Sequence, residues 1–153
     1  MSSGFRAQRA NTPDLWERTT LWTNSSPSSA FSAQTVSLSQ AFTNFDLIQI
    51  VYGRHKDTAS TDKDTKSNGD YLYSIYVTPA HLQDSIKTVS SGRYSATSIS
   101  IRTSNYVYAR AVSYNSSDGT SKLYIGTGNV VSSAAVDSNT NVIIPCYIFG
   151  IHL

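Results

Sequence analysis

The sequence predicts an all-β fold, an antiparallel β-sandwich of jelly-roll type, with a small Greek-key barrel as the alternative. Apolar residues recur at every second position in short blocks, which is the period of half-buried strands, and helical periodicity is almost absent. The blocks follow one another at roughly 8–12-residue spacing, with Gly, Ser, Asn and Asp between them. Only 14% of the residues are charged, so Ser, Thr, Asn and Tyr supply much of the polarity, as β proteins allow.

One domain is expected from the length of 153 residues, which is enough to bury a single core. We expect residues 1–12 to form a flexible N-terminal arm and residues 13–153 to form the domain. The net charge of +2 does not indicate nucleic acid as a partner, because Lys and Arg do not cluster on the expected strands. No apolar stretch approaches the ~20 residues that span a bilayer, so no membrane insertion is expected.

Five elements are expected in the first half of the chain. Leu15–Thr23 and Gln34–Ser39 alternate apolar and polar residues and predict strands. Phe45–Gly53 is apolar on both faces, which indicates a central strand that is covered on both sides. Tyr71–Thr78 predicts the next strand, and Ala80–Asp84 a single helical turn.

The second half predicts a hairpin. Arg93–Thr103 alternates isoleucine with polar residues, and Asn105–Tyr114 and Lys122–Val131 form two further strands. They flank a turn at Asn115–Thr120, in which Gly119 can adopt the positive φ that a tight turn requires. We therefore expect these two strands to pair antiparallel.

The closing run, Asn141–Ile151, predicts a long final strand with two apolar faces. Pro145 lies inside it and indicates an edge position or a bulge, because proline cannot donate to a ladder. An edge strand that is apolar on both faces needs cover, and a partner subunit is one way to supply it. The two faces are Val142, Ile144, Cys146 and Ile148, and Ile143, Tyr147, Phe149 and Ile151.

No catalytic site, metal site or cofactor is predicted, and we expect the protein not to be an enzyme. His55, His81 and His152 are scattered and have no partner histidine at ligand spacing. The single cysteine, Cys146, excludes an internal disulfide and is interpreted as a small buried apolar residue.

A long polar segment, His55–Asp70, separates two of the expected strands and is too long for a simple hairpin turn. Its part from Asp62 to Asp70 is rich in oxygen ligands and is similar to a calcium-binding loop. It departs from EF-hand spacing, because Lys66 stands where a third oxygen ligand belongs and Gly69 is displaced. We interpret the segment as an ordinary solvated loop.

Ten tyrosines are a high count for this length, and they allow two interpretations. Tyrosine favours strands and pairs well across them, which predicts a half-buried sheet face. An aromatic ring with a hydroxyl also suits a surface that binds a glycan or a protein. The candidate binding residues on the second interpretation are Tyr71, Tyr73, Arg102, Asn105, Tyr106, Tyr108 and Arg110.

Two parts of the sequence resemble a known family. The first is Leu21–Phe31, LWTNSSPSSAF, which continues through Gln34–Leu38 and Phe45–Tyr52; the second is the ending Ile143–Ile151, IIPCYIFGI. They resemble the opening and ending of domains in tail-fibre and other virion structural proteins of bacteriophages. Residues 54–141 are too variable to match. The sequence departs from the family pattern at Cys146, Phe149 and His152-Leu153, and in the enlarged His55–Asp70 segment.

The resemblance implies a β-sandwich in a homo-oligomeric, often trimeric, appendage at the surface of a virion, with no catalytic residue. The function expected from it is a tail-fibre or similar structural domain that self-associates, contacts other virion proteins and binds a host saccharide or surface protein. The alternative is a purely architectural head-fibre, decoration or baseplate component without a receptor. A glycan depolymerase is a third, remote hypothesis: sequence spacing does not test for its pair of acidic residues, because the two would come from different strands, and no motif supports it.

Overall fold

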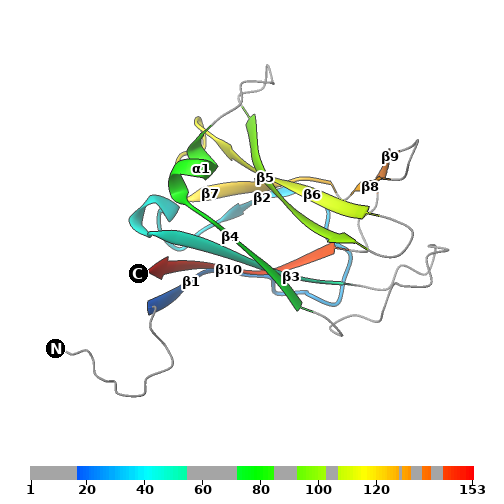
Figure 1. Cartoon of the computed structure of the whole chain (residues 1–153), viewed down its shortest axis with the longest axis horizontal. Helices are drawn as coiled ribbons and strands as arrows, with labels where there is room; N and C mark the ends of the chain where they lie inside the picture. Colours follow the sequence, from blue (N-terminus) through cyan, green and yellow to red (C-terminus); the bar gives the residue numbers. More distant parts are fainter. Residues whose placement is uncertain are drawn as a thin grey trace.

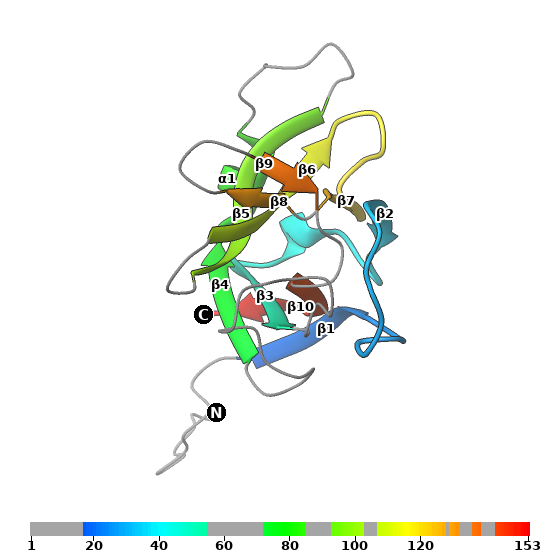
Figure 2. The same ribbon diagram turned by 90° about the vertical axis from the view of Figure 1, so that its right-hand side faces the viewer.

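The computed structural model describes residues 17–54, 72–84, 93–102, 107–127, 129–131, 136–138 and 143–153. In this part of the chain two antiparallel sheets pack face to face, and they do not close into a barrel (Figures 1 and 2). The predicted β-sandwich is therefore confirmed, and the barrel alternative is not.

Sheet A has the strand order β1-β10-β3-β4. Its strands are β1 (Glu17–Thr23), β10 (Ile143–His152), β3 (Leu47–Arg54) and β4 (Leu72–Val77). Each neighbouring pair is antiparallel. The first and last strands of the described chain therefore lie side by side, and β3 is a central strand, as its two apolar faces predict.

Sheet B is built around β6. This strand pairs with β5 on one side and with both β7 and β8 on the other, and β2 and β9 lie beyond them. The predicted hairpin is confirmed, and Gly119 in its turn has φ 82°. The strands are β2 (Gln34–Ser37), β5 (Arg93–Arg102), β6 (Val107–Asn115), β7 (Lys122–Ile125), β8 (Asn129–Val131) and β9 (Val136–Ser138).

A short helix, α1 (Pro79–Gln83), follows β4, where one helical turn was predicted. Pro79 suits its first position, because the missing N–H would have no helical partner there. The side-chain oxygen of Thr78 accepts a hydrogen bond from the backbone N–H of His81 at 3.1 Å and caps the turn. Leu82 is fully buried, so the turn is anchored by packing. A 3₁₀ turn, η1 (Phe42–Asn44), precedes β3.

The position of β10 corrects one prediction and confirms its alternative. Pro145 does not mark an edge, because β10 pairs with β1 on one side and with β3 on the other. It marks a bulge: the register with β3 shifts between Pro145 and Tyr147. The bulge accommodates the missing donor and lets a proline lie in a central strand.

The inner faces of the two sheets form one hydrophobic core. Sheet A supplies Ile48 and Ile50 of β3 and Ile148 of β10, all with no exposed surface. Sheet B supplies Ile99 and Val112, which are equally buried. The inner face of the final strand is therefore covered by the core of the same chain.

Gly150 of β10 packs closely on this core. A Cβ at this position would lie 2.5 Å from Cγ and Cδ2 of Phe45, a ring that is itself buried and lies against His152. The Cγ of a buried ring cannot move without displacing the backbone or its neighbours. We therefore expect Gly150→Ala to lower the free energy of unfolding by about 1–3 kcal/mol, the usual cost of overpacking, measured by urea denaturation.

Gly126→Ala is the matched control for this prediction. Its Cβ would meet the carbonyl oxygen of Ala111 at 3.5 Å, an ordinary contact, so we expect a change of less than about 1 kcal/mol. Adding Phe45→Ala to Gly150→Ala removes Cγ and both Cδ atoms, so it should relieve the clash and give a total cost below the sum of the single costs. Equal losses for Gly150→Ala and Gly126→Ala would contradict the close approach.

Candidate binding surface

Part of the predicted binding set lies outside the described residues. This holds for Tyr71, Asn105 and Tyr106, and for the calcium-like segment from Asp62 to Asp70. The described members are Tyr73, Arg102, Tyr108 and Arg110.

Tyr108 and Arg110 lie in the core, which corrects their assignment to an exposed face. Tyr108 is 2% exposed and Arg110 has no exposed surface. The guanidinium of Arg110 donates through Nε to the carbonyl of Ile143 at 2.8 Å, through Nη1 to that of Gly126 at 2.9 Å and through Nη2 to that of Phe31 at 2.6 Å. Burial lowers the pKa of Arg110 to about 10, so the side chain stays charged at neutral pH. It joins three parts of the chain instead of meeting a ligand at the surface.

Tyr73 and Arg102 lie near the side of the sandwich where β4 and β5 approach each other (Figure 2). Tyr73 is half-buried and stacks on Tyr52, with ring centroids 5.7 Å apart. The Tyr52 hydroxyl donates to the carbonyl of Ser100 on β5 at 2.7 Å, and burial raises its pKa. Of the described members of the set, only Arg102 is exposed. Tyr73 and its neighbour Tyr52 therefore help to join the two sheets.

The outer faces of the two sheets differ in character. On sheet B, the register of β5 and β6 places small side chains outward, together with Arg102 and Val107, and β7 adds Lys122 and Tyr124. The small ones are Ser98, Ser100, Ala109, Ala111 and the buried Ser113. On sheet A, the outward positions include Thr20 and Ser74 and a set of aromatic, apolar and cationic side chains, which we call the aromatic face. It consists of Arg18, Leu47, Gln49, Val51, Tyr76, Tyr147 and Phe149.

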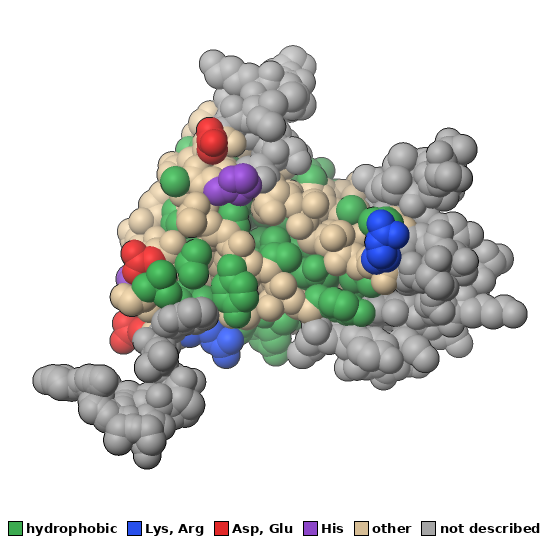
Figure 3. All heavy atoms as spheres, viewed as in Figure 1, with side chains coloured by type: hydrophobic (Ala, Val, Ile, Leu, Met, Phe, Trp, Pro, Cys, Tyr) green, Lys and Arg blue, Asp and Glu red, His purple; other side chains and the backbone are tan. Residues whose placement is uncertain are grey.

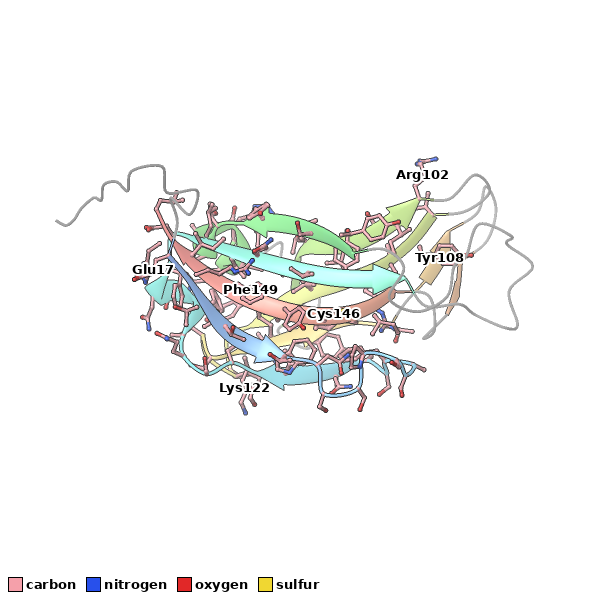
Figure 4. All side chains as sticks on the ribbon, turned by 90° about the horizontal axis from the view of Figure 1, so that it is seen from below. Glu17, Arg102, Tyr108, Lys122, Cys146 and Phe149 are labelled. Carbon is pink, nitrogen blue, oxygen red and sulfur yellow. The ribbon has the colours of Figure 1, made fainter. Side chains whose placement is uncertain are left out.

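The aromatic face is held by contacts across all the strands of sheet A (Figure 4). The guanidinium of Arg18 lies 4.1 Å from the ring centroid of Phe149, and its Nη1 donates to Oε1 of Gln49 at 3.3 Å. The Gln49 amide nitrogen donates to the hydroxyl of Tyr76 at 3.1 Å. Tyr147 stacks on Phe149 with centroids 5.4 Å apart and planes 19° apart. These contacts link the side chains across the four strands of the sheet.

Two rings of this face remain open to solvent. Tyr76 is 50% exposed and Tyr147 is 39% exposed, and they are among the exposed large hydrophobic side chains of the described chain. Leu47, Val51 and Phe149 are half-buried, whereas Gln49 is buried beneath its neighbours. In the view of Figure 3, hydrophobic side chains lie among polar ones over the visible face, with basic side chains at the lower margin and at the right.

The charge of the aromatic face is positive. Arg18 is exposed, and within the described residues its contacts are the Phe149 ring and Gln49, with no ion pair to a carboxylate. Glu17 alternates with Arg18 along β1 and so points to the other side of the sheet. Asp46 lies 4.0 Å from His152 and accepts a hydrogen bond from the backbone N–H of Leu153.

Sequence reasoning found part of this surface. It placed Tyr147 and Phe149 on one face of the final strand, but it did not connect them with Arg18, Gln49 or Tyr76. The available signal was the alternation within each strand, such as Gln49 between two inward-facing isoleucines of β3. The strand order that brings these four strands to one face cannot be predicted from the sequence of any one of them.

Other chemistry in the described part of the chain is limited. Among the described residues, no group of three or more His, Cys, Asp or Glu side chains is placed to hold a metal ion. Cys146 is buried, as predicted, and donates weakly to the carbonyl of Ile144; burial raises its pKa. No described helix has the length and apolar character needed to cross a membrane.

Comparison with known proteins gives no assignment. No protein-family model matches the sequence, and a search of the curated proteins finds no match.

Proposed function

We propose that this protein is a structural domain of a bacteriophage virion appendage, such as a tail fibre, that self-associates and attaches to the host surface through the aromatic face of sheet A. The appendage is exposed on the virion and is made in the host cytoplasm. The protein acts by binding and not by catalysis.

The observation that supports attachment is the aromatic face itself. Tyrosine and arginine are the residue types most enriched at energetically important positions of binding surfaces. Here Arg18, Tyr76 and Tyr147 lie on one face of sheet A, where Phe149 and Gln49 contact them. A side chain that is already ordered loses less conformational entropy when it binds.

The sequence resemblance supports the assignment to a virion. The two resembling parts lie at opposite ends of the chain, yet they contain the end of β1, most of β3 and most of β10, which are neighbours in sheet A, together with β2 of sheet B. They therefore belong to one structural unit. This is the arrangement expected if the two parts have been inherited together as the frame of one domain.

Self-association is tested by the mass of the purified protein in solution, measured by size-exclusion chromatography with light scattering. We expect a trimer, with three times the 16.7 kDa of the chain. The trimer should leave the aromatic face open. A monomer at all concentrations up to the micromolar range would contradict this part of the proposal.

Attachment is tested with virions and host cells of the phage that encodes the protein. Antibody against the purified domain should label a fibre or appendage by electron microscopy, and the free domain should inhibit adsorption. Labelling of the capsid shell, together with no effect of the free domain on adsorption, would instead support an architectural role.

A further inference from the structure

We infer that the aromatic face binds an acidic saccharide, with a carboxylate of the sugar held by Arg18 and a pyranose ring lying against Tyr147. The inference rests on the proposed function and specifies the ligand of the same surface. The evidence for it is the exposure and the contacts of Arg18, the arrangement of the aromatic rings, and the positive charge of the face.

Arg18 is prepared to receive an anion. Its guanidinium is held from two directions, by the Phe149 ring at 4.1 Å and by Gln49 at 3.3 Å, and the side chain is still exposed. The hydrogen bond to Gln49 uses one of the five N–H donors of the guanidinium. Two parallel donors can meet the two oxygens of a carboxylate, which is the strong, oriented form of this interaction.

The rings beside Arg18 suit a sugar. An aromatic ring has a negative face, and it attracts the weakly positive C–H groups on the flat side of a pyranose. Tyr147 stacks on the same Phe149 ring that Arg18 contacts, so the Phe149 ring lies between the cation and the open ring. Tyr76 flanks Gln49 on the other side and brings a hydroxyl to the face. One short oligosaccharide can therefore contact the cation, the aromatic ring and a polar group together.

The charge of the face argues against a second copy of this chain as the occupant. Among the described residues, the aromatic face contains Arg18 and no carboxylate, so a copy packed on it would offer Arg18 no acidic partner from the same face. A β-strand from another protein could pair only at the edge strands β1 and β4 and not on the face itself, since β10 and β3 are hydrogen-bonded on both sides. An acidic ligand that lies on top of the sheet meets neither obstacle.

Binding is tested by titrating the intact protein with short oligogalacturonates, hyaluronan fragments and mannuronate oligomers, followed by calorimetry and by NMR. At least one should bind, and its fully methyl-esterified form, which has the same rings without the charge, should bind about tenfold or more weakly. High salt should also weaken binding, because the partner charges are exposed. Failure of all three acidic series to bind at millimolar concentration would overturn the inference.

Variants then locate the site. Arg18→Gln and Tyr147→Ala should each weaken binding of the acidic oligosaccharide about tenfold or more, and Arg18→Lys should keep only part of the affinity, because its ammonium lacks the planar pair of donors. Lys122→Gln is the matched control: it removes one positive charge from an exposed side chain of sheet B (Figure 4). If Lys122→Gln weakens binding and Arg18→Gln does not, the site is elsewhere and the inference is wrong.

Failure of this inference can be told apart from failure of the proposed function. If Tyr147→Ala changes the oligomeric mass and not saccharide binding, the aromatic face is an interface between copies. If protease treatment of host cells abolishes attachment and periodate treatment does not, the partner is a protein. Both results would overturn the saccharide inference and leave the virion proposal intact, whereas absence of the protein from virions would overturn the proposal.

Discussion

Replacing Arg110 with methionine is expected to lower the free energy of unfolding by about 3–5 kcal/mol, a large part of the stability of a domain this size. The carbonyl groups of Phe31, Gly126 and Ile143 would lose the buried donor that now meets each of them. A buried acceptor without a partner costs about 1–3 kcal/mol. Methionine has a comparable length but offers no donor.

The loss of local stability should affect three parts of the chain, because the three carbonyls belong to different segments. Phe31 precedes β2, Gly126 lies between β7 and β8, and Ile143 begins β10. Arg110 also lies 5.3 Å from the Phe31 ring. We expect faster amide hydrogen exchange at all three segments in the Arg110→Met protein, beyond what global destabilisation produces in the rest of sheet A.

Two further variants separate charge from geometry. Arg110→Lys keeps the charge, but one ammonium cannot reach three divergent carbonyls, so an intermediate loss of about 2 kcal/mol is expected by urea denaturation. Arg102→Met, an exposed arginine on the neighbouring strand, should change stability by less than about 0.5 kcal/mol. Similar values for Arg110→Met and Arg102→Met would show that the buried network contributes nothing.

Arg110 also illustrates what the sequence predicts well and what it does not. The alternation of the chain predicted most of the strands, although the expected strand Lys122–Val131 is divided into β7 and β8 and β9 was not predicted. In β6 the alternation places Arg110 in phase with Tyr108 and Val112, both of which are buried. The residue type instead indicated an exposed position, because arginine is almost never fully buried without partners. The partners are backbone carbonyls from distant segments, which no local pattern reveals.

Pro145 gives a second example of this limit. The sequence indicated either an edge or a bulge, because neither position needs a ladder hydrogen bond from the N–H that proline lacks. The decision depends on which strand lies beside β10, and that strand, β1, comes from the other end of the chain. The aromatic face also depends on strand order, because Arg18 and Tyr76 lie 58 positions apart in the sequence and each forms a hydrogen bond with Gln49. Local periodicity predicts individual strands, whereas the order of the strands in a sheet determines which side chains share a surface.

Replacing Ile148 with aspartate is expected to prevent folding under native conditions. Ile148 has no exposed surface and lies on the inner face of β10, opposite Ile50 of β3. Loss of its packing costs about 2–5 kcal/mol, and a buried carboxylate without a partner adds several more. The sum reaches the whole stability of an ordinary domain. Circular dichroism and one-dimensional NMR should show an unfolded chain.

Tyr147→Asp is the matched control for the new charge, because it places the same carboxylate one residue away in the same strand. Tyr147 points outward and is 39% exposed, so the carboxylate stays hydrated and the fold should survive with a loss of about 1 kcal/mol. Its effect should fall on binding, where a new negative charge near Arg18 competes with an acidic ligand. A folded Ile148→Asp protein of native mass would mean that β10 is not the core strand described above.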